Sequence, residues 1–139
     1  MKQKKKKGNF KTGIILATTI VFLDWFFQQY FRKIGFGVAN FGISFGLAGE
    51  LDWFWKAIMP SLFLIAILYE YWSKKKISVY LCCLALGGVG NLIPRVIFGS
   101  VWDYVEIPFL SLWINLSDVL ISVSVLSYIL IADGDSSRI

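Results

Sequence analysis

The sequence contains no histidine, and its 139 residues include only two cysteines and three prolines. Without an imidazole the chain cannot use serine–histidine or cysteine–histidine nucleophilic catalysis, and it cannot build a histidine-based metal site. The two cysteines, Cys82 and Cys83, are neighbours within an apolar run, and adjacent cysteines rarely form a disulfide with good geometry. We therefore interpret both thiols as packing or lipid-facing groups.

Charged residues are also scarce and unevenly placed. They make up 17% of the chain, whereas 57% of the residues are hydrophobic; an average soluble domain has about 45–50% apolar and about 25% charged residues. Two basic clusters, MKQKKKK at residues 1–7 and SKKK at residues 73–76, contain eight of the 14 lysines and arginines in a chain with a net charge of +5. Such clusters beside apolar segments are typical of the cytoplasmic flanks of membrane spans, so we expect no nucleic-acid partner. The composition indicates a small integral membrane protein with a single domain, residues 1–139.

Four apolar segments are each close to the roughly 20 residues that a helix needs to cross a bilayer. They cover about residues 13–30, 53–72, 77–98 and 107–132. A cleaved signal peptide is one interpretation of the first segment, but it lacks a small-x-small cleavage site and contains Asp24. We therefore interpret it as a retained span. The sequence predicts an all-α membrane protein with four transmembrane helices.

The basic clusters also predict the orientation of the chain. With four spans, residues 1–7 and 73–76 lie on the same side, and the positive-inside rule places them in the cytoplasm together with both termini. The connecting segments 31–52 and 99–107 then face outward. The first of them contains FGVANFGISFGLAG, whose glycines and aromatic residues favour short strands or bent extended backbone. We expect a small extracytoplasmic β-like cradle from this loop, with an apolar loop dipping into the headgroups as the alternative.

Six polar residues interrupt the apolar pattern near one end of the predicted bundle. They are Asp24 in the first span, Asn91 and Arg95 in the third, Asp103 in the second outer segment, and Asn115 and Asp118 in the fourth. As part of one helix, Asp118 would lie about 15–16 Å beyond Pro108. A charged residue at the bilayer centre costs about 2.5–3.5 kcal/mol, so such residues face the bundle interior and are candidates for function. We expect the six to meet near the outer boundary, with a simple packing role as the alternative for any one of them.

In the absence of histidine, the chemistry open to these residues is that of a carboxylate pair. Two aspartates that lie close together cannot both ionise cheaply, so they share one proton. One then acts as a base on water, and the other acts as an acid toward a carbonyl or a leaving group. Asp103 and Asp118 are the natural pair because both lie near the outer end of the fourth span, although spacing in the sequence does not prove contact.

Four sequence blocks resemble signal peptidase II, the bacterial lipoprotein signal peptidase family. The blocks are LDWFFQQYF (23–31), NFGISFG (40–46), GGVGNLIPRVIFGSVWDYV (87–105) and INLSDVLI (114–121). The resemblance implies an intramembrane aspartic endopeptidase of the bacterial cytoplasmic membrane. Such an enzyme removes signal peptides from prolipoproteins by cleaving before the diacylglyceryl-cysteine at the outer face. The resemblance also implies contact with membrane lipids, inhibition by globomycin-type peptides, and no metal or organic cofactor.

The resemblance further assigns roles to individual residues. Asp103 and Asp118 match the catalytic aspartates of the family, and Asn91, Arg95 and Asn115 match polar residues that position the substrate and the pair. Asn40 and Gly42 match the outer-loop motif of the substrate cradle. Asp24 matches an acidic residue for which a supporting role is expected.

This chain departs from the family pattern at four places. Pro94 and Gln28 stand where the family usually has Asp and Lys, and Ile114 and Ser117 replace Phe and Ala. Pro94 also removes a backbone donor, so we expect the third helix to kink or end there. Two alternatives to an active peptidase stay open. One is a catalytically inactive homologue that acts as a binding module, and the other is a non-enzymatic four-helix protein that binds a substrate or relays protons through its buried acids.

Overall fold

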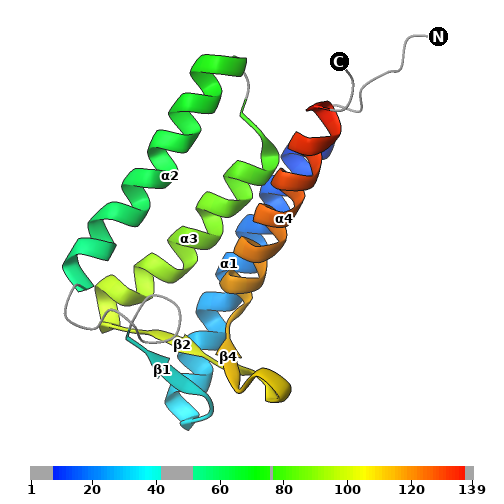
Figure 1. Cartoon of the computed structure of the whole chain (residues 1–139). Coiled ribbons are helices and arrows are strands. Elements are labelled where there is room, and N and C mark those ends of the chain that lie inside the picture. Colours follow the sequence, from blue (N-terminus) through cyan, green and yellow to red (C-terminus); the bar gives the residue numbers. More distant parts are fainter. Residues whose placement is uncertain (1–7, 42–51, 76, 137–139) are drawn as a thin grey trace.

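The computed structural model describes residues 8–41, 52–75 and 77–136, and its main part is a helical bundle (Figure 1). The helices are α1 (Gly8–Ile34), α2 (Asp52–Lys74), α3 (Val79–Phe98) and α4 (Leu116–Ser136). Short strands lie at one end of the bundle, opposite the end where α1 begins and α4 finishes (Figure 1). The predicted combination of four helices with a small β part is therefore confirmed.

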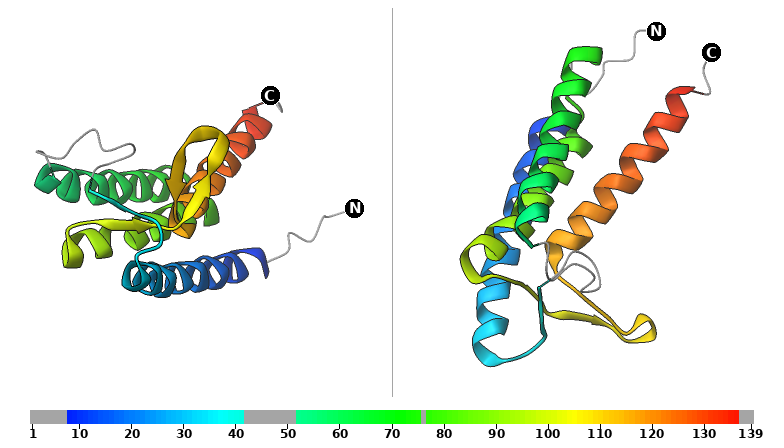
Figure 2. Two further views of the ribbon diagram at one scale, coloured as in Figure 1. Left: turned by 90° about the horizontal axis from the view of Figure 1, so that it is seen from below. Right: turned by 60° about the vertical axis from the view of Figure 1, so that its left-hand side comes forward.

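Helix α3 lies at the centre of the bundle and contacts the other three helices. Its close approach to α4 requires glycine, because a Cβ at Gly87 would lie 2.8 Å from Cγ1 of Ile121 and 3.1 Å from the carbonyl oxygen of Ser117. Small residues allow this kind of backbone approach between membrane helices. Helix α4 is inclined to the other helices and diverges from α2 along its length (Figure 2).

The distribution of polar side chains is inverted relative to that of a soluble protein. Phe22 and Phe26 of α1 are 68% and 62% exposed, whereas Asp24 on the same helix is fully buried. In the described part of the chain, Phe10–Ile34 and Val79–Phe98 are long and apolar enough to cross a membrane, and Leu116–Leu130 is a shorter apolar helix. Buried acids and an apolar exterior are what a bilayer environment demands. The crossing of a membrane by all four helices stays a prediction.

Helix α3 has clear signals at both ends and continues through its proline. Ser78 is the N-cap, and its hydroxyl oxygen accepts a hydrogen bond from the N–H of Tyr80 at 3.2 Å. Pro94 is buried inside the helix, which ends four residues later at Phe98. The helix therefore does not end at Pro94, and the alternative expectation of a kink there stays a prediction. The proline lies in the last turn, where it removes one hydrogen bond, and Gly99 then closes the helix in the left-handed conformation.

The strands form two small antiparallel ribbons. Strand β1 (Val38–Asn40) pairs with β2 (Val101–Asp103), and β3 (Val105–Ile107) pairs with β4 (Leu112–Ile114) around a 3₁₀ turn at Pro108–Leu110. The loop after α1 therefore contributes a strand, as expected, but the partner of that strand comes from the segment after α3. The rest of the loop, including Gly42, lies outside the described residues.

The fourth helix begins later than the sequence predicts. The apolar run from residue 107 first forms the turn and strand β4, and α4 starts at Leu116. Pro108 begins the 3₁₀ turn, and Asn115 caps the following helix. Asp118 is therefore not 15–16 Å along a helix from Pro108. It lies in the first turn of α4.

The start of α1 and the end of α2 lie at the same end of the bundle, as predicted, whereas the lysines of residues 1–7 lie outside the described residues. Helix α1 begins there, and the turn after α2 places Lys74 and Lys75 there (Figure 1). Glu70 is buried at this end, where it accepts hydrogen bonds from the backbone N–H of Ser78 at 2.8 Å and from Nζ of Lys74 at 3.3 Å. The assignment of this end to the cytoplasm stays a prediction.

Candidate active site

Five of the six predicted polar residues meet where the strands join the helices. Asp103 ends strand β2, Asn115 precedes α4, and Asp118 lies in its first turn. Asn91 and Arg95 are one turn apart on α3. The pairing of β1 with β2 adds Asn40, which the sequence placed in the outer loop. The predicted convergence is therefore confirmed for these residues.

A chain of side-chain amides connects the two aspartates. Nδ2 of Asn115 donates to Oδ1 of Asp103 at 2.8 Å and to Oδ1 of Asn91 at 3.1 Å. Nδ2 of Asn91 then donates to Oδ1 of Asp118 at 2.7 Å. On the other side, Nδ2 of Asn40 donates to Oδ2 of Asp103 at 3.0 Å. Each carboxylate is thus held by neutral donors, which fix its orientation without neutralising its charge.

The spacing of Asn115 and Asp118 has a local explanation. The side chain of Asn115 accepts a hydrogen bond from the backbone N–H of Asp118 at 3.0 Å, and the carboxylate of Asp118 accepts one from the N–H of Asn115 at 3.1 Å. This reciprocal arrangement is a capping box, here built from Asn and Asp. The residues that would perform the chemistry therefore also begin the helix, so the position of Asp118 is fixed by the backbone itself.

Asp24 is the centre of a separate cluster beneath the start of α4. It is completely buried, and its carboxylate accepts hydrogen bonds from the hydroxyls of Tyr104 (2.8 Å) and Ser117, and from the N–H of Leu116 at 3.0 Å. Nε2 of Gln28 also donates to it, at 2.9 Å. A carboxylate at a helix N-terminus satisfies unpaired N–H groups and is favoured by the helix dipole. The expected supporting role of Asp24 therefore has a concrete form, which is to anchor the first turn of α4.

Gln28, a departure from the family pattern, links this cluster to strand β2. Its amide nitrogen donates to Asp24, and its Oε1 accepts the backbone N–H of Trp102 at 3.3 Å. A lysine side chain has donors but no acceptor, so it cannot make the second contact. This role of Gln28 could not be predicted from the sequence, because nothing local indicates that β2 passes beside α1.

Arg32 is a further residue that the sequence analysis did not single out. Its NH2 group donates to the carbonyl oxygen of Ser100 at 2.9 Å, and its guanidinium lies 4.3 Å from the centre of the Phe98 ring. It therefore holds the turn between α3 and β2 against α1. Arg95, in contrast, donates to the carbonyl oxygen of Asn91 on its own helix at 3.3 Å.

The electrostatic environment raises the pKa of the carboxyl group at the end of β2. Burial raises the pKa of Asp103 to about 6, and the nearby charge of Asp118 also raises it. Hydrogen bonds from Asn40 and Asn115 and the charge of Arg95 act in the opposite direction. Burial and the neighbouring Asp24 raise the pKa of Tyr104 as well, so this phenol remains a hydrogen-bond donor. Two acids that compete for one proton are suited to acid–base catalysis.

The described residues suggest no metal-binding set. Across residues 8–41, 52–75 and 77–136 there is no group of three or more His, Cys, Asp or Glu side chains that could hold an ion.

Comparison with known proteins shows the family to which the chain belongs. The family model described as "Signal peptidase (SPase) II" matches residues 9–132. The chain belongs to the signal peptidase II family. It is 35% identical over 139 residues to the lipoprotein signal peptidase of Anaplasma phagocytophilum, an alignment that covers 84% of this chain and 88% of that protein. The resemblance inferred from the sequence blocks is thus confirmed.

Two further similarities to known proteins differ in extent. The lipoprotein signal peptidase of Photorhabdus laumondii is 35% identical over 74 residues, which cover 48% of this chain but only 44% of that protein. A solved structure described as a bacterial membrane enzyme studied by the in meso method superposes with a TM-score of 0.76 at 22% identity. It covers 94% of this chain and 92% of the other, so the two proteins share their fold.

Proposed function

We propose that this protein is an aspartic endopeptidase that removes signal peptides from diacylglyceryl-modified prolipoproteins and cleaves before the lipidated cysteine. The observation that carries this proposal is the connected set Asp103–Asn115–Asn91–Asp118 at one end of an apolar bundle. Family membership supports the substrate class, since the relatives described above are lipoprotein signal peptidases.

In the proposed reaction the two aspartates share one proton. The ionised carboxylate takes a proton from a water molecule, whose oxygen attacks the scissile carbonyl carbon. The protonated carboxyl group gives its proton to the carbonyl oxygen, which yields a neutral tetrahedral intermediate. When the C–N bond breaks, the amine leaving group takes a proton from the acid that the attack step created. At the same time one hydroxyl of the tetrahedral carbon gives its proton back to the other carboxylate as the C=O bond re-forms. The pair again holds one proton after product release, as aspartic protease chemistry requires.

The surrounding residues supply orientation and access. The amides of Asn40, Asn91 and Asn115 keep the carboxylate oxygens in fixed positions, so little reorganisation is needed during the reaction. The tip of the β3–β4 ribbon presents Phe109 and Leu110, which are 86% and 60% exposed. An apolar tip beside the site suits a substrate that arrives from the bilayer with its acyl chains. We place the site at the outer membrane face, with the lysine-rich end in the cytoplasm.

The decisive experiment is cleavage of a lipidated precursor by purified variants. Asp103→Asn and Asp118→Asn should each lower the rate by at least about 10²–10⁴-fold, because each removes one partner of the acid–base pair. Glu106→Gln is the matched control, since Glu106 is an exposed carboxylate in strand β3 of the same β region. Wild-type cleavage should be blocked by globomycin. Near-normal cleavage by either folded Asp variant would exclude the assigned pair, and an inactive wild-type protein would favour the binding module.

The arrangement of the acidic residues supports a proton relay less well than it supports a peptidase. Asp24, Asp103 and Asp118 lie toward the strand end of the bundle, whereas Glu70 is at the other end and is bound to Ser78 and Lys74. The α3 segment between these ends, from Val79 to Gly90, contains no carboxylate. Proton flux into liposomes that contain the purified protein tests the relay directly, and a flux abolished by Asp24→Asn would favour it over the peptidase.

A further inference from the structure

The two residues that flank Asp103 in the sequence are both attached to helix α1. The backbone N–H of Trp102 donates to Oε1 of Gln28 at 3.3 Å. The hydroxyl of Tyr104 donates to Oδ1 of Asp24 at 2.8 Å. Gln28 and Asp24 are one turn apart on α1, and Nε2 of Gln28 donates to Oδ2 of Asp24 at 2.9 Å. The segment that carries Asp103 is therefore held on both sides by a single turn of α1.

The segment that carries Asp118 is attached to the same carboxylate of α1. The backbone N–H of Leu116 donates to Oδ1 of Asp24 at 3.0 Å, and the hydroxyl of Ser117 donates to Oδ2. Leu116 and Ser117 directly precede Asp118 at the start of α4. Oδ1 of Asp24 accepts one hydrogen bond from each of the two segments. A single buried carboxylate therefore joins the chain segments that carry the two aspartates of the proposed pair.

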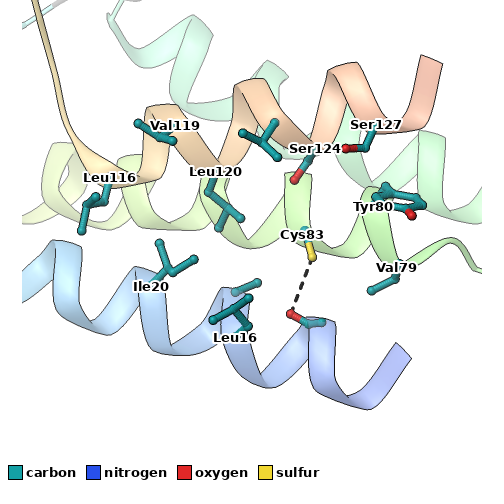
Figure 3. Close-up of a pocket in the computed structure, with 13 residues that line it drawn as sticks. Leu16, Ile20, Val79, Tyr80, Cys83, Leu116, Val119, Leu120, Ser124 and Ser127 are labelled. Atoms are coloured by element: carbon teal, nitrogen blue, oxygen red, sulfur yellow. Dashed lines mark hydrogen bonds between the residues drawn. The ribbon is translucent and has the colours of Figure 1, made fainter. Parts of the chain in front are cut away.

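Below this carboxylate, the packing between α1 and α4 is incomplete. A groove of about 390 Å³ lies between the two helices, with Leu116 toward one end and Ser127 toward the other (Figure 3). Leu16 and Val123, which line the groove, are 59% and 55% exposed. Close packing holds neighbouring elements in one position, and vacant volume removes that constraint. The position of the start of α4 relative to α1 therefore depends on the hydrogen bonds to Asp24.

The side chains of this connection are shielded from bulk water and from a substrate. Asp24, Gln28 and Ser117 are 0% exposed, and Tyr104 is 7% exposed. The ring of Tyr104 is held independently of its hydroxyl, because it stacks on the ring of Phe31 at a centroid distance of 5.0 Å. A hydrogen bond removed here is not replaced by one to bulk water. Its loss should therefore release the attached segment.

The spacing of the two aspartates matters because they compete for one proton. Burial raises the pKa of Asp103 and the charge of Asp118 adds to this effect, whereas the charge of Arg95 on α3 opposes it. Repulsion between two carboxylates falls with distance, so a wider spacing makes the doubly ionised pair easier to form. The asparagine amides orient the carboxylates, whereas the hydrogen bonds to Gln28 and Asp24 hold the backbone that carries them.

We infer that Gln28 and Tyr104 are positioning residues, which act through Asp24 and fix the spacing of the proposed catalytic pair. An amide suits position 28 because it donates to one partner and accepts from the other. Neither residue touches the substrate in this role. The inference rests on the proposed function, since the spacing affects cleavage in this way only if the two aspartates share a proton.

The pH dependence of precursor cleavage by the purified full chain tests the inference. Gln28→Met and Tyr104→Phe remove hydrogen bonds and nearly keep the size of the side chain. In each variant kcat should fall about 10-fold or more, since a misplacement of about 1 Å can cost about 10²-fold. KM should change by less than about twofold, because both side chains are buried away from the substrate.

The shape of the pH profile separates positioning from a general loss of stability. The alkaline limb of kcat reports loss of the proton that the pair shares. Widening a carboxylate spacing of about 4 Å by about 1 Å, at an effective dielectric constant of about 20, moves this limb by about 0.6 units to lower pH. We expect a shift of this size in both variants.

A control and a double variant complete the experiment. Gln29→Met is the matched control, because Gln29 is the next residue of α1 and its amide nitrogen has no hydrogen-bond partner among the described residues. Its kcat and pH profile should equal those of wild type. Because Gln28 and Tyr104 both act through Asp24, the loss of kcat in the double variant should be smaller than the product of the two single losses.

Three results would overturn the inference. They are a wild-type kcat and pH profile in the folded variants, a lower kcat with an unmoved alkaline limb, and a double-variant loss equal to the product. Tyr104→Phe keeps the ring stacking, so the inference stays testable if Gln28→Met does not fold. A wild-type protein that does not cleave the precursor would overturn the proposed function as well, whereas an active wild type with unaltered variants would overturn this inference alone.

Discussion

Replacing Asp24 with asparagine removes the acceptor that anchors the start of α4. The carboxylate accepts four hydrogen bonds, two on each oxygen. In Asp24→Asn one oxygen becomes an NH₂ group, so Gln28 and Ser117 face a donor instead of an acceptor. A hydrogen bond to a charged group contributes about 1.5–3 kcal/mol, so the loss of two costs about 3–6 kcal/mol. That is a large part of the roughly 5–15 kcal/mol by which native proteins are stable.

The matched variant is Ser117→Ala, which removes one donor and leaves three hydrogen bonds to Asp24. It should cost about 1–3 kcal/mol. If the serine acts through Asp24, the double variant should be more stable than the sum of the two single effects predicts. Unfolding of the purified proteins in mixed detergent, followed by circular dichroism, gives the three free energies. An Asp24→Asn protein as stable as wild type, or strictly additive effects, would refute the anchoring role.

Two further predictions concern the site itself. Asn115→Ala removes both the helix cap and the bridge to Asp103, so stability should fall by about 0.5–2 kcal/mol from the cap alone, and precursor cleavage should fall more than in Leu116→Ala, measured in the same assay. The second concerns pH. The pKa of Asp103 is about 6 in the folded protein, above the roughly 3.9 of an unfolded chain. The contribution of Asp103 to the stability of the folded protein is therefore complete below about pH 4 and is lost as the pH rises through about 6. Asp103→Asn, which we expect to be inactive, should consequently be more stable than wild type at pH 8, and this advantage should disappear by about pH 4. An advantage independent of pH would contradict the assignment.

The convergence of the polar residues could be predicted from the sequence because it depends only on the depth of each residue along its predicted membrane span. Asn91 and Arg95 share a helical face, and Asp103 and Asp118 flank the same end of a span, so alternation of span direction is enough to bring them together. The absence of histidine indicated a carboxylate pair. The choice of Asp103 and Asp118 as that pair rests on their position and on the family resemblance, and it stays a prediction. The structure adds the asparagine bridges, whose geometry no spacing rule supplies.

The start of α4 was mispredicted because hydropathy does not distinguish helix from strand. The stretch PFLSLWI is apolar throughout, and length favoured one long span. The correct signals were nevertheless present. Pro108 is typical of a turn, and the Asn115-x-x-Asp118 pattern is a capping box that marks a helix start.

Contacts between segments that are far apart in the sequence could not be predicted. Tyr104 is 80 residues from Asp24, and Trp102 is 74 residues from Gln28. Each contact exists because β2 crosses the end of α1, and that path depends on the pairing of β1 with β2. The sequence indicated extended backbone after α1, but it did not indicate which segment would pair with it.

The register of the β1–β2 ribbon has a consequence for how this enzyme family can vary in length. Val38 lies opposite Asp103, and Gly37, at φ 104°, leaves no room for a Cβ beside the backbone of that aspartate. Side chains alternate between the two faces of a strand, so inserting one residue between Gly99 and Asp103 would present Trp102 where the carboxylate now lies. Two inserted residues would restore the face but lengthen the turn that Arg32 holds. The number of residues between the end of α3 and Asp103 is therefore constrained by the alternation of side chains along the strand as well as by the length of the turn. We expect insertions to be tolerated only outside this interval.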